Sequence, residues 1–227
     1  MAKTIIVGGF GPGIATAVAE KFGAEGFAVA LVGRNAERLA AGVAALDAKG
    51  IKAAAFPADL GVPAAIKPLV AKVRETLGPI SVLHWNAYSL SAGDALSADV
   101  AGLRSVFDVA IVGLTLAVQE SLADLKAAKG AVLVTNGGLL FDDPKINELG
   151  GTRNLMGLSM GNAAKHKLVG MLAAKLKADD VYVGEVIVSG TIKGSSFDTG
   201  NGNLDGSVVA QKFWDLFQAR TETSAKA

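Results

Sequence analysis

The chain opens with a short apolar strand pattern that runs directly into a glycine-rich turn. The strand covers Thr4 to Val7, and the turn reads GGFGPGIA from Gly8 to Ala15, before a helical pattern begins. One glycine at the end of a parallel strand permits a tight turn, a second lets the backbone approach a pyrophosphate, and a small third residue lets helix and sheet pack closely. The first N–H groups of the helix then point at the phosphates. This order predicts a dinucleotide site with contacts from Gly9, Phe10, Gly13 and Ile14.

A second apolar strand pattern, Ala28 to Val32, ends where such sites select between the two nicotinamide dinucleotides. It is followed by Gly33, Arg34 and Asn35, so no carboxylate stands there to accept hydrogen bonds from a ribose 2′-hydroxyl. Arg34 can instead pair with a 2′-phosphate through its planar fork, and Arg38 adds positive charge. We therefore predict NADP(H) as the cofactor, in contact with Arg34 and Asn35. The alternative is a solvated arginine at the start of a helix.

Strand-like and helix-like segments alternate along the whole chain. The strand patterns cover Thr4–Val7, Ala28–Val32, Ala53–Phe56, Ile80–Trp85, Ala131–Thr135 and Val183–Val188. The helical patterns cover Gly13–Glu25, Ala36–Lys49, Pro63–Leu77, Ala98–Ala127, Leu158–Ala178 and Ser207–Arg220. Such alternation predicts a parallel sheet, and near-continuous apolar strands indicate helices on both of its faces. We expect one domain over residues 1–227, a doubly wound Rossmann-type α/β fold, with an irregular loop from Phe141 to Asn154 over the carboxyl ends of the strands.

The composition narrows the range of partners. The 22 basic and 21 acidic residues leave a formal net charge of +1, which indicates neither nucleic acid nor an anionic membrane as a partner. The chain has no cysteine, which excludes disulfides, thiolate metal sites and a cysteine nucleophile, and makes the cytoplasm the default location. The first strand begins within a few residues of Met1, which leaves no room for a signal segment. The longest apolar run, Val109 to Val118, is far shorter than the ~20 residues that span a bilayer, so we predict a buried helix.

Glycine and asparagine motifs follow the strands in a fixed order. Gly9, Gly13 and Ala15 stand where the pattern TGxxxGxG has its glycines, and an NAY segment follows the fourth strand like an NAG motif. Near the end, VSGT at residues 188–191 is similar to a PG segment with serine in place of proline. With this order the chain resembles the short-chain dehydrogenase/reductase family over nearly its whole length. The resemblance implies an oxidoreductase in which the cofactor is contacted by Asp59, Leu60, Asn86, Ala87 and Tyr88.

Other residues occupy the positions at which that family carries its catalytic groups. The resemblance puts Gly137 at the family's serine, or Asn136 if the register moves by one, Leu158 at its tyrosine and Asn162 at its lysine. We therefore assign no catalytic residue and no metal site. We expect a substrate pocket with extra volume, because the phenol and the hydroxyl are missing. It is formed by Asn136, Gly137, Leu158, Asn162 and Thr191.

Other side chains near this pocket have alternative interpretations. Tyr88 is the one tyrosine placed to reach a nicotinamide, either as a proton donor or, in the simpler interpretation, as a wall residue. His84 lies within a strand pattern, which indicates a core histidine rather than a base. Lys165, His166 and Lys167 follow Asn162 by one helical turn, and we interpret them as a solvated helix face, with Lys165 directed at the ribose as the alternative.

Two functions from different classes are consistent with the sequence. One is an NADP(H)-dependent oxidoreductase of small molecules, with atypical or weak catalysis, that uses substrate groups, water or Tyr88 for the proton. The other is a catalytically silent dinucleotide-binding protein that acts as a cofactor sensor or a structural partner. Family members commonly pair two long helices across a two-fold axis, and Leu103–Leu125 and Leu168–Leu176 carry surplus apolar surface that such a contact would bury. We therefore expect a homotetramer or a homodimer.

Overall fold

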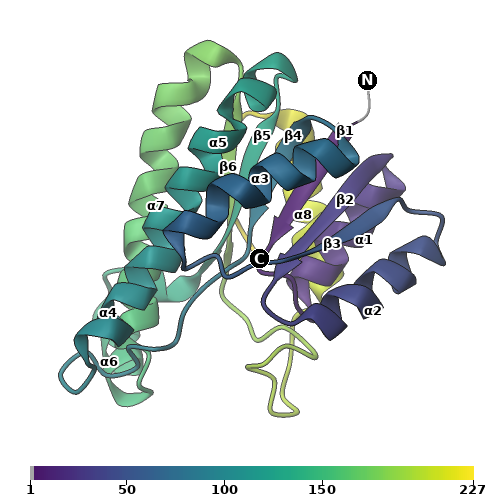
Figure 1. Ribbon diagram of the computed structural model, residues 1–227. Coiled ribbons are helices and arrows are strands. Elements are labelled where there is room, and N and C mark those ends of the chain that lie inside the picture. Colours follow the sequence, from purple (N-terminus) through teal and green to yellow (C-terminus); the bar gives the residue numbers. More distant parts are fainter. Residues whose placement is uncertain (1–2) are drawn as a thin grey trace.

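The computed structural model describes residues 3–227, and a seven-stranded parallel sheet forms its centre (Figure 1). The strands are β1 (Lys3–Gly8), β2 (Phe27–Gly33), β3 (Ala53–Pro57), β4 (Ile80–Trp85), β5 (Ala131–Gly137), β6 (Tyr182–Val188) and β7 (Ser224–Lys226). They lie in the order β3-β2-β1-β4-β5-β6-β7, which reverses between β1 and β4. Ligands of doubly wound sheets bind in the crevice at such a reversal. The predicted Rossmann-type fold class is confirmed, and each of the six predicted strands is found within two residues of its expected ends.

Helices cover both faces of the sheet. One face carries α1 (Ile14–Ala24), α2 (Ala36–Asp47) and α8 (Gly206–Ala219), and the other carries α3 (Pro63–Leu77), α5 (Leu114–Ala127) and α7 (Met156–Leu176) (Figure 1). Successive side chains of a strand point to opposite faces, so Ile5 and Val7 pack with the first group of helices and Ile6 packs with the second. The strands are therefore buried on both sides, as their continuous apolar sequences predict.

The helical pattern Ala98–Ala127 forms one continuous helical segment with a π-helical insert. α4 (Val100–Phe107) leads through the π-helical turn Asp108–Gly113 into α5. At this turn the backbone of Gly113 meets the carbonyl oxygen of Leu60 so closely that a side chain would not fit. π-Helical turns inside α-helices are frequent at functional sites. This one packs against α7, the helix that carries the predicted pocket residues Leu158 and Asn162.

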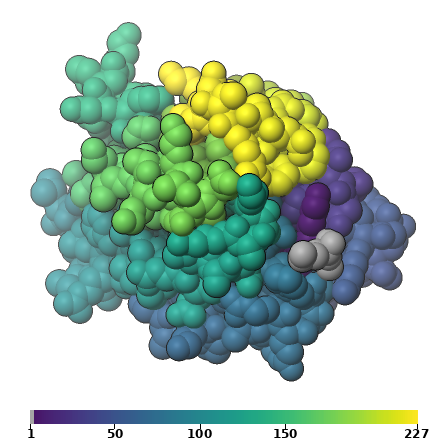
Figure 2. Space-filling view, turned by 90° about the horizontal axis from the view of Figure 1, so that it is seen from above, coloured from purple at the N-terminus to yellow at the C-terminus, as the bar shows by residue number. Residues whose placement is uncertain are grey.

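The segment Val100–Ala127 also leaves apolar surface uncovered. Among the described residues it is the one helix that is long and apolar enough to cross a membrane by length and composition alone, and 33% of its most apolar stretch is buried. In the structure α5 packs against α3 and β4, so the segment is part of the layered fold. Viewed from above, the teal atoms of the region of α5 adjoin the green atoms of the region of α7 (Figure 2).

The prediction of an irregular loop from Phe141 to Asn154 is wrong in its central part. A helix, α6 (Pro144–Thr152), forms there after a 3₁₀ turn at Gly138–Leu140. The carboxylate of Asp143 caps this helix by accepting a hydrogen bond from the backbone N–H of Lys145 at 2.9 Å. Pro144 occupies its first turn, where the fixed φ of proline suits a helix and its missing N–H has no cost. An ordered helix therefore lies beside the carboxyl ends of the strands.

The last strand, β7, has no counterpart among the predicted elements. β7 pairs in parallel with β6. β6 itself follows a second short 3₁₀ turn, Lys177–Asp179. Just before β7, the hydroxyl of Tyr182 donates a hydrogen bond to the carbonyl oxygen of Glu222 at 2.6 Å. Burial raises the pKa of Tyr182 to about 12. These contacts fix the end of the chain against the edge of the sheet.

Candidate functional site

The glycine-rich turn lies at the crevice between β1 and β4, and its shape depends on two glycines. Gly9 has φ 81° and Gly13 has φ 88°, a region that favours glycine. A Cβ atom on Gly9 would lie 2.7 Å from the Cα atom of Ala87, and one on Gly13 would lie 2.7 Å from Cγ2 of Ile192. The turn is held in place because the N–H groups of Gly9 and Phe10 donate to the carbonyl oxygen of Val32, at 3.0 and 2.8 Å. Two chain segments therefore pack directly on the turn.

The start of α1 has no side-chain cap. Gly13 is its N-cap residue, so no side chain satisfies the first N–H groups of the helix. Ile14 follows as the first helical residue and is half-buried. Free N–H groups at a helix start, together with the helix dipole, make an anion site. The predicted pyrophosphate cradle therefore has the backbone geometry that such a group needs.

Some predicted cofactor residues direct their side chains elsewhere. The ring of Phe10 packs under α2, where a Cβ atom on Gly42 would lie 2.6 Å from its Cε1 atom. Leu60 is buried below Gly8, and Asn35 caps α2 by accepting a hydrogen bond from the N–H of Arg38 at 2.8 Å. The Leu60 side chain is therefore withdrawn into the core, and the Phe10 ring is partly buried against α2.

Two arginines flank the space between the turn and the end of β2. Arg34 follows β2 directly and is exposed. The Nη1 atom of Arg38 lies 3.9 Å from the position that a Cβ atom on Gly11 would occupy, so this guanidinium reaches the turn itself. No ion pair between described residues involves either arginine. Both charges are therefore free to meet a phosphate.

The segments after β3 and β4 complete the cradle. Asp59 is exposed, and its carboxylate accepts a hydrogen bond from the N–H of Gly61 at 2.9 Å. Asn86 donates from its N–H to the carbonyl oxygen of Gly8 at 2.8 Å and from Nδ2 to that of Gly9 at 3.3 Å. Asn86 thus fixes the end of β4 to the turn, and Ala87 follows it in contact with Gly9.

Tyr88 connects this cradle to the loop that follows β6. Its hydroxyl lies 3.0 Å from the hydroxyl of Ser196, and its ring centre lies 5.6 Å from that of Phe197. The loop is held by Asp198, whose carboxylate accepts hydrogen bonds from three glycine N–H groups, and these bonds lower the pKa of Asp198. Thr191 donates from its N–H to Asn203 at 2.9 Å. The loop therefore has an internal framework and closes over the turn.

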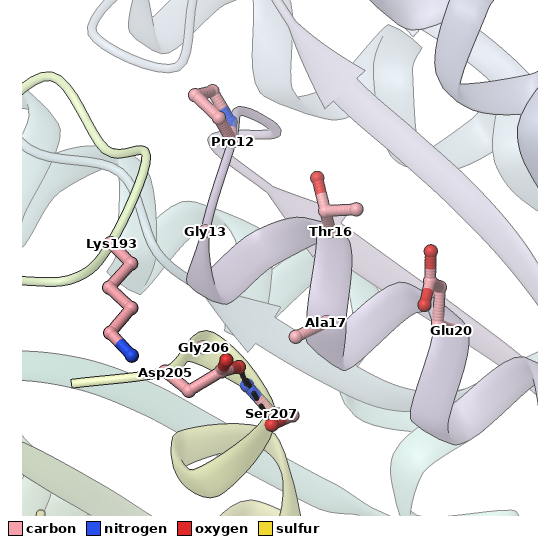
Figure 3. Close-up of a pocket in the computed structure, with 9 residues that line it drawn as sticks. All are labelled: Pro12, Gly13, Thr16, Ala17, Glu20, Lys193, Asp205, Gly206 and Ser207. Atoms are coloured by element: carbon pink, nitrogen blue, oxygen red, sulfur yellow. Dashed lines mark hydrogen bonds between the residues drawn. The ribbon is translucent and has the colours of Figure 1, made fainter.

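A hollow of about 340 Å³ adjoins the turn on the side of α1 and α8 (Figure 3). Gly206 brings the start of α8 against Gly13, where a Cβ atom would lie 2.8 Å from the Gly13 carbonyl. Figure 3 shows Lys193 extending from its loop toward Asp205, which caps α8 through the N–H of Ser207 at 2.9 Å. The hollow is lined by Pro12, Gly13, Thr16, Ala17, Glu20, Lys193, Asp205, Gly206 and Ser207.

The predicted pocket residues Gly137, Leu158 and Asn162 lie close together where β5 ends beside α7. A Cβ atom on Gly137 would lie 2.8 Å from Nδ2 of Asn162. The cavity between α7 and α4 is only about 10 Å³, so the expected extra volume is absent, and the Asn162 side chain takes up the space beside Gly137. This cavity is lined by Tyr88, Ser89, Val106, Ala110, Leu158, Gly161, Asn162 and Lys165.

Asn136, Gly137 and Thr191 do not line this cavity. Asn136 is buried and donates from Nδ2 to the carbonyl oxygen of Asn162 at 3.1 Å and to Oε2 of Glu185 at 2.9 Å. Glu185 is fully buried on β6 and also binds Nδ1 of His166 and the hydroxyl of Ser224. This polar cluster fastens α7 to the sheet, which is a structural task for Asn136.

The interpretation of Lys165 as part of a solvated face is wrong. The residue is 3% exposed and lines the small cavity. Burial lowers the pKa of Lys165 to about 8, with Glu185 acting in the opposite direction. The sequence carried one signal for this position, since residues 158, 162 and 165 share a helical face. Of its neighbours, Lys167 is exposed and His166 is half-exposed.

His84 is a core residue, as the strand pattern indicates. It is fully buried, with Nε2 at 3.1 Å from the hydroxyl of Thr135 and its ring against Phe213. Burial lowers the pKa of His84 to about 3, so the ring is neutral in the physiological range. His84 is therefore not positioned to act as a base at the crevice.

The sequence of this chain is similar to those of known dehydrogenases. The family model for short chain dehydrogenases matches residues 3–140. The chain is 38% identical over 81 residues to 2,3-dihydro-2,3-dihydroxybenzoate dehydrogenase of Bacillus subtilis, covering 36% of this chain and 31% of that protein. It is 32% identical over 133 residues to meso-2,3-butanediol dehydrogenase of Serratia marcescens, covering 59% of this chain and 52% of that protein. The matched parts are thus about half of these relatives or less.

Solved structures agree over the full length. A short-chain dehydrogenase/reductase from Serratia marcescens superposes with a TM-score of 0.84 at 20% identity, covering 100% of this chain and 96% of that one. A metagenomic short-chain oxidoreductase in complex with NADP superposes with a TM-score of 0.82 at 21% identity, covering 99% and 96%. The fold, the glycine-rich turn and the match over residues 3–140 together show that this chain belongs to the short-chain dehydrogenase family.

Proposed function

We propose that the chain is an NADP(H)-binding oxidoreductase whose catalytic set departs from that of its family. The observation that carries the proposal is the turn between β1 and α1, in which Gly9 and Gly13 have positive φ and α1 starts with N–H groups that no side chain caps. A bound nicotinamide would supply hydride transfer, which is chemistry of the cofactor. The protein contributes the cradle, the orientation of the cofactor and the walls of the substrate space.

The choice of NADP(H) over NAD(H) rests on Arg34 and Arg38. Both guanidinium groups are free of carboxylates, and that of Arg38 reaches the turn. A planar guanidinium pairs well with a phosphate, and nothing at the end of β2 offers a carboxylate to a free ribose hydroxyl. One structural neighbour was solved with NADP, which is a property of that protein and agrees with this choice.

The departure in catalysis rests on Gly137, Leu158 and Asn162. No hydroxyl or phenol stands at these positions, so none of them can donate a proton to a developing alkoxide. General acid–base groups accelerate a reaction about 10²- to 10⁴-fold. The residues at the three aligned positions cannot supply this acceleration. We therefore expect slow reduction of simple ketones.

A catalytically silent role, as a cofactor sensor or a structural partner, is the second candidate. The observation that favours it is the size of the cavity beside Leu158 and Asn162, which at about 10 Å³ has room for little more than one water molecule. A complete cofactor cradle beside a nearly filled substrate space is what a sensor would need.

We also propose that copies of the chain associate through α4, α5 and α7. Large apolar side chains are exposed on α4, on the π-helical turn that leads into α5, and on α7. Burial of such helical surface across a two-fold axis gives a homodimer, and two such contacts give a homotetramer. The exposed side chains are Val100, Phe107, Val112, Met160 and Met171.

A turnover screen separates the two candidate functions. NADPH consumption is followed with a panel of ketones, aldehydes and enones, against controls without substrate. An oxidoreductase consumes NADPH with at least one member of the panel, whereas a sensor binds NADPH and consumes none. Rapid reduction of simple ketones that survives Tyr88→Phe would contradict the proposed departure in catalysis.

A further inference from the structure

The loop of residues 193–203, which follows β6, is a compact unit with a closed base. Ile192 and Leu204 form a β-bridge at that base, and the N–H of Lys193 donates to the carbonyl oxygen of Leu204 at 2.9 Å. Inside the loop, the carboxylate of Asp198 accepts hydrogen bonds from three glycine N–H groups. Because most of its polar contacts are internal, the loop is built to move as one body about its base.

The middle of this loop contacts the segment after β4. The hydroxyl of Ser196 lies 3.0 Å from that of Tyr88, and the ring centres of Phe197 and Tyr88 lie 5.6 Å apart with their planes inclined by 32°. At the base of the loop, Ile192 packs on the glycine-rich turn at Gly13. The loop therefore extends from the start of α1 to the segment after β4, across the crevice in which a doubly wound sheet binds its ligands.

Tyr88 lies between the turn and the positions aligned with the family's catalytic residues. The preceding residue, Ala87, contacts the turn at Gly9. Tyr88 itself lines the cavity beside Leu158 and Asn162, which at about 10 Å³ has room for about one water molecule and none for a nicotinamide ring. A dinucleotide with its pyrophosphate at the turn must pass Tyr88 to reach those positions. A seated nicotinamide and the contact between Tyr88 and the loop therefore exclude each other.

The contact between Tyr88 and the loop is exposed to water, which makes it weak. Tyr88 is 40% exposed and Phe197 is 42% exposed. Water competes for a hydrogen bond between two surface hydroxyls, and a single aromatic pair adds little to it. In the part of the chain that the structure describes, no other hydrogen bond joins the loop to the segment after β4. Loss of these few contacts is enough to free the loop from that segment.

We propose that Tyr88, Ser196 and Phe197 form a latch that holds the loop of residues 193–203 closed over the nicotinamide end of the nucleotide site. A nucleotide binds fully only after the latch opens, so its affinity is reduced by the fraction of molecules in the open form. A weaker latch raises that fraction, which speeds association and leaves dissociation unchanged. The proposal rests on the proposed function for the identity of the ligand, whereas the opening of the latch is a property of the chain alone.

The opening of the latch is measured without nucleotide. The chain has no cysteine, so Asn162→Cys places a single thiol at a position that is 5% exposed and lines the cavity behind Tyr88. The rate at which a monofunctional maleimide labels this thiol, relative to the rate in the unfolded chain, reports the open fraction. In this background, we expect Tyr88→Phe to raise the labelling rate about 3- to 10-fold, the effect of one lost hydrogen bond.

Matched variants make the labelling result decisive. Ser196→Ala removes the other half of the same hydrogen bond, so it should raise the rate by the same factor, and the double variant should exceed neither single one. Tyr182→Phe is the control, because its hydroxyl binds the Glu222 carbonyl at the opposite end of the sheet, and it should leave the rate unchanged. Thermal unfolding checks that each variant is folded. Equal labelling rates with and without Tyr88→Phe and Ser196→Ala overturn the latch.

Stopped-flow binding of NADPH separates this proposal from the proposed function. With Asn162 intact, Tyr88→Phe should raise the association rate constant by the same factor as the labelling rate and leave the dissociation rate constant unchanged. Labelling that responds to Tyr88→Phe in a chain that binds no NADPH would support the latch and refute the proposed cofactor. NADPH binding together with unresponsive labelling would support the cofactor and refute the latch.

Discussion

At the scale of single residues, the cofactor cradle depends on backbone shape more than on side chains. Gly9 and Gly13 have positive φ and pack against neighbouring segments. Leu60 places its side chain in the core, and the Phe10 ring is partly buried against α2. Arg34 and Arg38 are charged side chains beside the cradle, and neither forms an ion pair with another described residue.

Replacement of Gly13 by alanine tests the close approach at the turn. Gly13→Ala forces a residue with a Cβ atom to φ 88° and puts that atom 2.7 Å from Ile192. Gly26→Ala is the matched control, because Gly26 has φ 86° but no atom near its Cβ position. We expect Gly13→Ala to lower the free energy of unfolding by about 1–3 kcal/mol more than Gly26→Ala in urea titrations. Equal losses would show that Ile192 does not pack on the turn.

Removal of the Arg34 guanidinium tests the choice of cofactor. Arg34→Ala should weaken NADPH binding about 10- to 100-fold, the usual range for a lost charge-assisted hydrogen bond, and leave NADH binding unchanged. Arg153→Ala, an exposed arginine on the C-terminal side of α6, is the control. An unchanged NADPH dissociation constant in Arg34→Ala would refute the assignment of the 2′-phosphate to this residue.

The sequence predicted the backbone motifs well. It predicted less well which polar side chains are buried and which groups they contact. The glycine spacing predicts the turn because the conformation of glycine is a local property. The burial of Lys165 and the helix-capping role of Asn35 depend on which element packs opposite. Helical periodicity places Lys165 on the face of Leu158 and Asn162, yet a charged residue is by default interpreted as solvated.

At the scale of elements, α7 carries Leu158 and Asn162, which the resemblance aligns with the family's tyrosine and lysine, and it is fastened to the sheet by buried polar bonds. Asn136 and Glu185 hold it from β5 and β6, and Gly161 lets it approach α4. The π-helical turn Asp108–Gly113 lies against the same helix. The geometry of the substrate space therefore depends on how α7 is positioned.

Reinstating the family's residues on these elements tests the account of catalysis. Gly137→Ser, Leu158→Tyr and Asn162→Lys together should raise ketone reduction by up to about 10²–10⁴, the share of general acid–base groups. Gly137→Ser alone should destabilise the protein, because its Cβ atom would lie 2.8 Å from Nδ2 of Asn162. The check is NADPH consumption with a simple ketone. No gain in a folded triple variant that binds NADPH would show that the register of α7 differs from that of the family.

The elements that the sequence missed share a physical cause. β7 is only three residues long, and it exists because β6 offers it an unpaired edge. α6 depends on a cap from Asp143 and on Pro144, in a stretch with several glycines that indicate a loop. Strong apolar periodicity, by contrast, predicts the other helices and strands, since a buried face is encoded in each of them.

At the scale of the whole molecule, a doubly covered sheet leaves one side with exposed apolar helices. If this side is an interface, light scattering should give a dimer or tetramer at micromolar concentration. Phe107→Glu combined with Met171→Glu should shift the mass to that of a monomer, because two charges would be buried in the contact. Val62→Glu, at an exposed apolar residue before α3, is the control. A monomeric wild-type chain would contradict the proposed association.

The central claim is that the glycine-rich turn of this chain, with the arginines beside it, forms a site for NADP(H). Calorimetric titration of the wild-type protein with NADPH and with NADH tests it most directly. The account predicts one NADPH per chain, bound at least tenfold more tightly than NADH. Equal affinity for the two nucleotides, or no binding of either, would contradict it.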